Sequence, residues 1–363
     1  MAILSTLKTM FKVAVQRTAA PLKPDEADLE KMSVEKLNLY GQRLLKQGQW
    51  DEAQQVLLLA VERAENERGT EQRSWATLHL ATLCQGRGDF HQAMTLSQQA
   101  LGLAERNGDR DLMSVIYNQI GSTFRMQGQY PQAIDYYQKS LEITQQQGDE
   151  DNMAAVYGNL GVVYEMQGDF DCAIEASEKG LALNLKLGRD EGAAKDYGNL
   201  GGVFRRQGHY ERAVEVHQRS LQIKLRLGDE QGAAQTYGNL GSVHGELGDL
   251  DAAQQMFQKA LEIFQRIGDE PATGAVFCNL ALVSQWKGEV ARALEYYDKS
   301  LKISEHIGDR HTSAHTYSNL AILCHDLGER AQARANYEKA KALFEIVGDA
   351  RNAQQAARAL REV

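Results

Sequence analysis

The chain has 363 residues and a formal net charge of -9, with 43% hydrophobic and 25% charged residues. These proportions exclude an intrinsically disordered chain, and the acidic balance gives no global basic field of the kind that binds nucleic acid. No run of 18 or more apolar residues predicts a transmembrane helix, and four widely spaced cysteines exclude a disulfide framework and are typical of a reducing compartment.

Residues 1–18 are predicted to form an amphipathic helix, because apolar side chains recur on one face while Lys8 and Lys12 lie on the other. Three interpretations stay open for this helix: packing on the repeats that follow, binding to a membrane surface, and an organelle transit peptide. Residues 19–30 contain two of the four prolines and are predicted to be a linker.

Residues 31–349 repeat with a period of 40 residues. One glycine column recurs without a gap from Gly48 to Gly328, and an alanine follows each of these glycines five residues later. A second glycine column starts at Gly108. Internal periods of this length indicate stacked structural repeats, each of which buries its apolar face against its neighbours.

Each repeat is predicted to contain two antiparallel helices. In residues 110–147, apolar residues at helical spacing are interrupted at Gly128, and Pro131 stands near the start of the second helix. The predicted fold is therefore all-α, a solenoid of eight antiparallel helix pairs. A capping helix is predicted over residues 350–363, where Arg361 replaces the small residue of the other repeats.

The order of apolar and small residues resembles the tetratricopeptide repeat (TPR). In the third repeat this order is carried by Tyr117, Ile120, Gly121, Phe124, Ala133, Tyr137 and Ser140. The 40-residue period is longer than the roughly 34 residues of the family, and with its NLG and LGD motifs it is similar to the LGN/Pins and rapsyn type adaptors. This resemblance implies that the first helix of each pair lines a concave groove, where asparagines grip the backbone of an extended peptide.

One column of amide side chains lies in the middle of the first helices. Its members are Gln119, Asn159, Asn199, Asn239, Asn279 and Asn319. Asparagine is a mediocre helix former, but its amide both donates and accepts hydrogen bonds. Two interpretations stay open: the column binds a peptide in the groove, or each asparagine bonds to the neighbouring helix and fixes the stacking of the repeats.

Basic and apolar residues lie on or beside the same stripe of the first helices. The basic residues are Arg125, Lys195, Arg205 and Arg206, and the apolar residues predicted to anchor a partner are Met166 and Trp286. These basic residues predict a partner peptide with acidic residues, because a guanidinium binds a carboxylate through two parallel hydrogen bonds. The alternative is a solvated helix face of mixed charge.

No catalytic constellation, phosphate-binding loop or cofactor motif stands out from the repeat pattern, so neither enzyme activity nor a cofactor is expected. His311 and His315 have the spacing of metal ligands, but no third ligand lies on the same turn of that helix. We therefore expect no metal site.

The expected function is that of a cytoplasmic, non-enzymatic scaffold or signalling adaptor that binds an extended peptide of a partner protein in its groove. Two alternatives stay open. One is a regulatory or sensor module that controls a transcription factor or kinase, and the other is a scaffold recruited to a membrane by residues 1–18. Nucleic acid is not an expected partner.

Overall fold

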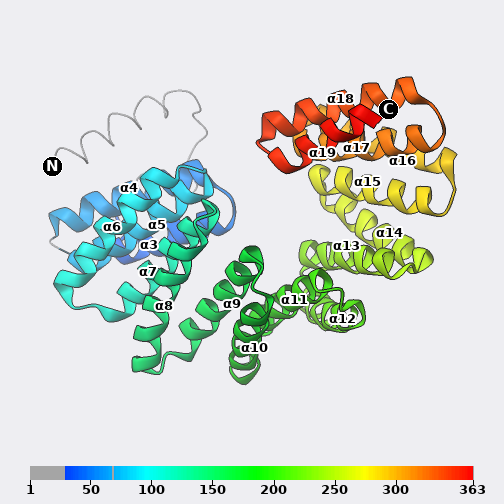
Figure 1. Cartoon of the computed structure of the whole chain (residues 1–363). Helices are drawn as coiled ribbons and strands as arrows, with labels where there is room; N and C mark the ends of the chain where they lie inside the picture. Colours follow the sequence, from blue (N-terminus) through cyan, green and yellow to red (C-terminus); the bar gives the residue numbers. More distant parts are fainter. Residues whose placement is uncertain (1–28, 68, 363) are drawn as a thin grey trace. The chain divides into compact units, whose positions relative to one another are not determined.

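The computed structural model describes residues 29–67 and 69–362, and these residues form seventeen helices and no β-strand (Figure 1). The predicted all-α class is confirmed. The amphipathic helix predicted over residues 1–18 and most of the predicted linker lie outside the described residues. Within the described part, no helix has the length and apolar character needed to cross a bilayer.

The helices belong to two compact units, the first ending at Val156 and the second starting at Tyr157. The first unit contains α3 (Val34–Lys46), α4 (Trp50–Asn66), α5 (Thr70–Gly86), α6 (Phe90–Asn107), α7 (Arg110–Met126), α8 (Tyr130–Gln147) and the start of α9 (Glu150–Gln167). The second unit contains the rest of α9, α10 (Phe170–Lys186), α11 (Asp190–Arg206), α12 (Tyr210–Leu227), α13 (Glu230–Leu247), α14 (Leu250–Ile267), α15 (Glu270–Trp286), α16 (Val290–His306), α17 (Arg310–Asp326), α18 (Arg330–Val347) and α19 (Ala350–Glu362).

The two glycine columns end helices, as the sequence predicts. After α8, Gly148 adopts a φ of 70°, in the left-handed region that glycine enters without a steric penalty. The next residue, Asp149, accepts a hydrogen bond on its Oδ1 from the backbone N–H of Asn152 at 3.1 Å, which caps α9. A Gly-Asp pair therefore ends one helix and starts the next within two residues.

Within each pair, the two helices approach closely where the first helix carries a small residue. A Cβ atom added to Gly121 would lie 2.8 Å from the ring of Tyr137, and one added to Gly241 would lie 2.9 Å from the ring of Phe257. Both rings are buried. Glycine at these positions is thus a packing requirement of the helix pair.

Successive pairs of the first unit are joined by an apolar layer. Leu44, Leu57 and Leu83 are buried in one continuous cluster, and Ile116 packs with Ala104 in the next cluster. Burial of a leucine or isoleucine side chain contributes about 1.5–3 kcal/mol to folding. The hydrophobic effect therefore stabilises the stacking of these repeats.

The corresponding layer of the second unit contains polar pairs. Asn184 of α10 donates from its Nδ2 to Oδ2 of Asp196 in α11 at 2.7 Å, and both side chains are buried. Burial raises the pKa of Asp196 to about 6, although the bond from Asn184 lowers it. One repeat further on, Lys224 donates to Oγ1 of Thr236 at 2.9 Å. Buried or partly buried hydrogen bonds therefore contribute to stacking at these two junctions, whereas Phe264 and Val276 lie in an apolar cluster at the junction of α14 and α15.

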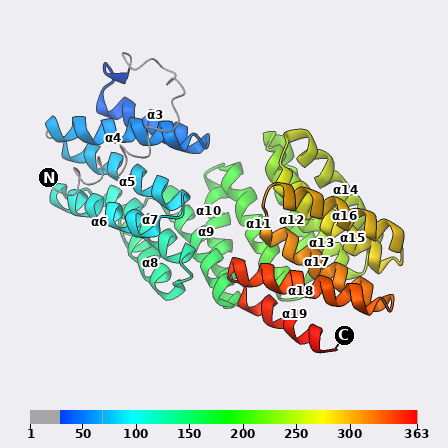
Figure 2. The ribbon, with the colours of Figure 1, turned by 90° about the horizontal axis from the view of Figure 1, so that it is seen from above.

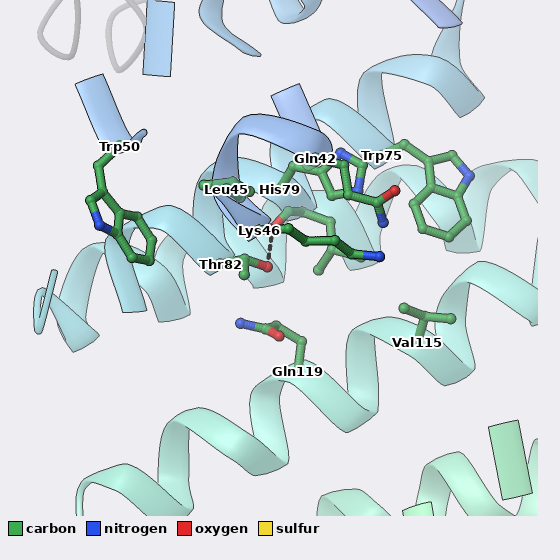
Figure 3. Close-up of a pocket in the computed structure, with 10 residues that line it drawn as sticks. Gln42, Leu45, Lys46, Trp50, Trp75, His79, Thr82, Val115 and Gln119 are labelled. Carbon is green, nitrogen blue, oxygen red and sulfur yellow. Dashed lines mark hydrogen bonds between the residues drawn. The ribbon is translucent and has the colours of Figure 1, made fainter. Parts of the chain in front are cut away.

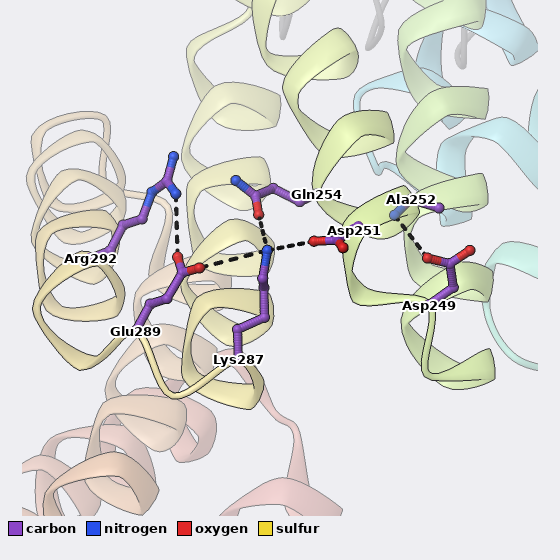
Figure 4. A network of polar contacts seen from close by, with 7 residues as sticks. All are labelled: Asp249, Asp251, Ala252, Gln254, Lys287, Glu289 and Arg292. Atoms are coloured by element: carbon purple, nitrogen blue, oxygen red, sulfur yellow. Dashed lines mark hydrogen bonds and ion pairs between the residues drawn. The ribbon is translucent and has the colours of Figure 1, made fainter.

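In the described part of each unit, a basic side chain after a first helix joins neighbouring pairs at the surface, and we call this arrangement a surface clamp. Lys287, after α15, lies 2.7 Å from Oδ1 of Asp251 and 2.9 Å from Oε1 of Gln254 in α14 (Figure 4). Arg87, after α5, makes the same two contacts with the carboxylate and the amide that stand 36 and 33 residues before it. Because the two clamps have the same spacing in sequence, the 40-residue repeat determines surface contacts as well as buried ones.

The last helix, α19, packs against α18 and buries Ala353 and Ala356 (Figure 2). Ala356 lies in a cluster with Tyr337 of α18. The charged side chains of Arg358 and Arg361 are exposed. The predicted helix at the C-terminal end of the repeats is confirmed.

Candidate peptide-binding face

The first helix of each pair carries four columns of residues, which we call the first-helix stripe. In α9 its members are Ala155, Asn159, Val162 and Met166, and in the other first helices they are the residues at multiples of 40 from these. Steps of three and four residues place side chains on one face of an α-helix. The stripe therefore presents one continuous strip of side chains on each first helix.

A pocket of about 320 Å³ opens in the first unit among α3, α5 and α7. Its lining residues are Gln42, Leu45, Lys46, Trp50, Trp75, Leu78, His79, Thr82, Val115 and Gln119 (Figure 3). In the view of Figure 3, the indoles of Trp50 and Trp75 stand at opposite ends of this group. Apolar walls with a few polar groups are typical of ligand pockets, and the volume suits one large side chain.

The pocket coincides with the first-helix stripe. The lining residues that occupy its four columns are, in order, Trp75 and Val115, His79 and Gln119, Gln42 and Thr82, and Lys46. Helical periodicity and the position of the cavity are independent observations, and both select the same face. Among the predicted groove residues, Gln119 is the one that lines this pocket, where its Nε2 also donates to Oε1 of Gln85 at 2.7 Å.

His79 carries the least satisfied polar group of the pocket. Burial lowers the pKa of His79 to about 4, so its imidazole is uncharged at neutral pH. Its Nδ1 is buried without a hydrogen-bond partner among the described residues, and its ring centre lies 5.9 Å from that of Trp75. A buried polar atom without a hydrogen-bond partner destabilises the protein.

Sequence reasoning missed His79. The predicted amide column starts at Gln119, and the same register taken back by 40 residues reaches His79. The 40-residue period therefore marks His79 as a member of this column. It was missed because its side chain is an imidazole, whereas the predicted members carry amides.

The asparagines of the second unit lie in different surroundings. Asn199 is half-buried, and its Nδ2 makes no hydrogen bond to any residue that the structure describes. Asn319 donates from its Nδ2 to the Sγ of Cys278, in the preceding first helix, at 3.5 Å. Of the other members, Asn159 and Asn279 are half-buried and Asn239 is exposed. Asn319 thus supports the interpretation in which the column links repeats, whereas the contacts of Asn199 support neither interpretation.

The two adjacent arginines predicted to bind acidic ligand residues are paired within the protein. Arg205 donates to Oε1 of Glu246 at 2.8 Å, and Arg206 lies 3.5 Å from Oε1 of Glu165, each one repeat away. All four side chains are partly exposed, so these ion pairs are individually weak. A carboxylate of a ligand must therefore replace an internal partner.

The remaining predicted residues differ in accessibility. Lys195 is exposed, whereas Arg125 is half-buried beside Tyr137, whose pKa is raised by burial and lowered by Arg125. Met166 is 45% exposed and Trp286 is 50% exposed. Large apolar side chains with this exposure have the area that an anchor for a partner needs.

A tetratricopeptide repeat model matches residues 33–106, 112–186, 189–266 and 271–346, which together make up most of the chain. The chain therefore belongs to the tetratricopeptide repeat family and is a protein-interaction or regulatory repeat module. The predicted TPR solenoid is confirmed. No curated protein sequence matches the chain, and the likeness to LGN/Pins and rapsyn type adaptors stays a prediction.

Solved structures of other repeat proteins share the fold. A signal transduction ATPase with numerous domains and a tetratricopeptide repeat sensor, from Pyrococcus horikoshii, is 18% identical with a TM-score of 0.68, over 89% of this chain and 50% of that one. This chain thus spans about half the length of that ATPase. A Rap protein complexed with competence and sporulation factor is 17% identical with a TM-score of 0.61, over 91% and 96% of the two chains. The quorum sensor NprR from B. thuringiensis, in its apo form, is 14% identical with a TM-score of 0.59, over 91% and 98%.

Proposed function

We propose that the chain is a non-enzymatic adaptor that binds an extended segment of a partner protein along the first-helix stripe. The pocket of the first unit is the observation that carries this proposal, because it lies on the stripe and is lined by apolar side chains together with His79 and Gln119. Three successive first helices contribute to its walls. An extended peptide that crosses these helices meets each of them in turn.

The chemistry of the pocket defines the side chain that it accepts. Leu45, Leu78 and the two indoles suit one aromatic or large aliphatic residue, and burial of such a residue dominates the affinity of most interfaces. Lys46 is exposed at this pocket and carries only hydrogen-bond donors. The favoured ligand therefore has an acidic residue close to the apolar one.

In the second unit we assign a separate contact to Asn199. Its Nδ2 has no partner among the described residues, and because this atom is buried, the half-buried side chain must rotate to donate to a backbone carbonyl of the peptide. A contact to the backbone does not select the peptide sequence. Specificity would then come from anchors such as the half-exposed ring of Trp286.

A second candidate function is ligand sensing within a regulatory module. The Rap protein with a similar fold is complexed with competence and sporulation factor, and NprR is a quorum sensor. Both match more than nine-tenths of this chain. A sensor would use the same stripe, but ligand binding would change the packing between its repeats.

Selection of a random peptide library on the full chain tests the adaptor function. The enriched peptide is titrated by calorimetry into the wild type and into Trp75→Ala, His79→Ala and Asn199→Ala variants. We expect enriched sequences with a large apolar residue near an acidic one. Each pocket variant should bind about ten-fold more weakly, which corresponds to about 1.4 kcal/mol.

His91→Ala is the matched control, because His91 is exposed on α6, a second helix of the same unit. Its affinity should equal that of the wild type. Peptides that bind the Trp75→Ala and His79→Ala variants as tightly as the wild type would refute the proposal. Altered amide exchange between repeats on addition of the same peptide would favour the sensor.

A further inference from the structure

Three potential metal ligands converge at the end of the second unit. His311 and His315 lie on α17, and Asp349 lies in the turn between α18 and α19. One ligand atom from each of the three residues lies within 4.8 Å of the other two. The imidazole centres of the two histidines are 4.6 Å apart.

The cluster arises from two different repeats. His311 and His315 are four residues apart, so they share a face of α17. Asp349 follows Gly348 in the second glycine column and caps α19, since its Oδ1 accepts from the backbone N–H of Asn352 at 3.0 Å. No third ligand lies on the same turn of α17, and the stacking of the next pair supplies one.

The histidine pair departs from the repeat pattern. The residues that occupy the two positions in the other first helices from α7 to α15 are Asp111 and Val115, Asp151 and Ala155, Glu191 and Lys195, Gln231 and Gln235, and Pro271 and Ala275. Because five other first helices form without histidine at these two positions, the repeat fold does not require it there. In contrast, aspartate is the usual residue of the Gly-Asp turn, so Asp349 alone would signify only a helix cap.

The surroundings hold one ligand in place. The ring of His315 packs edge-on against that of Phe344, with 5.0 Å between the ring centres, and this contact orients the imidazole.

We infer that His311, His315 and Asp349 bind a divalent transition metal ion, with zinc as the best fit. Two imidazoles and one carboxylate are ligands that zinc accepts at about 2.0–2.2 Å, whereas calcium and magnesium prefer oxygen ligands alone. A tetrahedral zinc site separates its ligand atoms by about 3.3 Å, so the ligand atoms must approach one another by up to about 1.5 Å on binding. His311 is exposed and has the rotamer freedom for this movement.

The metal ion would connect α17 to the start of α19. Since α18 lies between these helices in the chain, the ion closes a link of 34 residues from His315 to Asp349. Such a link stabilises the final helix pair by binding only its folded state. It leaves the first-helix stripe of the preceding repeats unchanged.

Calorimetric titration of zinc ions into the full chain, after removal of metals by a chelator, tests this site. We expect one zinc ion per chain with a dissociation constant in the micromolar range or below, and a rise in the melting temperature when zinc is present. His311→Ala and His315→Ala should each weaken binding by about 100-fold or more. Cobalt should give the intense visible absorption of a tetrahedral site.

Asp349→Asn is the discriminating variant, because asparagine is also a good helix cap but lacks the charge of the carboxylate. It should keep the metal-free melting temperature and weaken zinc binding by about ten-fold. His325→Ala, on the same helix but outside the cluster, is the control and should bind zinc as the wild type does. Absence of zinc binding, or equal binding by the His311→Ala variant, would overturn the inference.

Discussion

The junction of α6 and α7 in the first unit and the junction of α10 and α11 in the second occupy the same positions of the 40-residue frame, but they are filled with different chemistry. In the first unit, Ile116 and Ala104 meet in an apolar layer. In the second unit, the equivalent positions hold Asp196 and Asn184, which form a buried hydrogen bond. The comparison shows that the glycine positions and helix ends define the fold, whereas the layer between pairs is free to vary in polarity.

The difference predicts unequal tolerance of charge at equivalent positions. Ile116→Asp places a carboxylate opposite Ala104, which offers no hydrogen bond, and an unpaired buried charge is strongly unfavourable. We expect the first unit to lose about 4 kcal/mol or more of unfolding free energy. Amide hydrogen exchange followed by mass spectrometry measures this loss in each unit separately.

Gln98→Asp is the control for this change, because it adds the same charge at an exposed site on α6. Its effect should be small. Equal protection of the first unit in the Ile116→Asp variant and the wild type would show that the apolar layer is not what holds these pairs together.

A fall in pH should lower the unfolding free energies of the two units by different amounts. In the first unit, the pKa of His79 falls from 6.5 to about 4 on folding, so the unfolded chain binds the proton more tightly. The unfolding free energy of this unit should therefore decrease between pH 6.5 and pH 4, by up to about 3 kcal/mol. Amide exchange over this pH range checks the slope.

In the second unit, His217 and Asp196 act in opposite directions. His217 has a pKa of about 4 and destabilises the fold as the pH falls below 6.5. Asp196 has a pKa of about 6 against an ordinary 3.8, so the folded state binds its proton more tightly and gains stability from pH 6 to 3.8. The Asp196→Asn variant should lose this offset and become more acid-sensitive. An unchanged pH profile would contradict this account.

The smallest difference should come from the surface clamps. Arg87→Met in the first unit and Lys287→Met in the second remove one clamp each, and exposed ion pairs contribute little. Both melting temperatures should fall slightly, and the difference from the wild type should vanish in concentrated salt. Arg358→Met, at an exposed site on α19, is the control. A loss that persists in salt would mean that the clamps act by packing.

Much of the fold was predictable because its determinants recur at a fixed spacing. The turn at Gly148 and the close contact at Gly121 each have counterparts 40 residues away, so the sequence displays them several times. Predicting the stripe from helical spacing also located the face on which the pocket opens. These features depend on residues close together in the chain or exactly one period apart.

The candidate site was less predictable because its partners depend on packing. Arg205 and Arg206 follow each other in sequence, yet their partners Glu246 and Glu165 lie in opposite directions, each 41 residues away. Neither helical spacing nor the 40-residue period marks these pairs. The empty hydrogen-bonding position of His79 likewise depends on the burial of its ring, which spacing alone does not provide.

The Gly-Asp corner has a consequence for how the length of this protein can change. At Gly148 and Asp149 all the backbone bonds are local, since Asp149 donates to the carbonyl of Thr144 at 2.9 Å and accepts from Met153 at 3.0 Å. A corner built in this way needs nothing from distant parts of the chain. Whole 40-residue blocks can therefore be duplicated or deleted at these corners, which makes the reach of the molecule adjustable in steps during evolution or design.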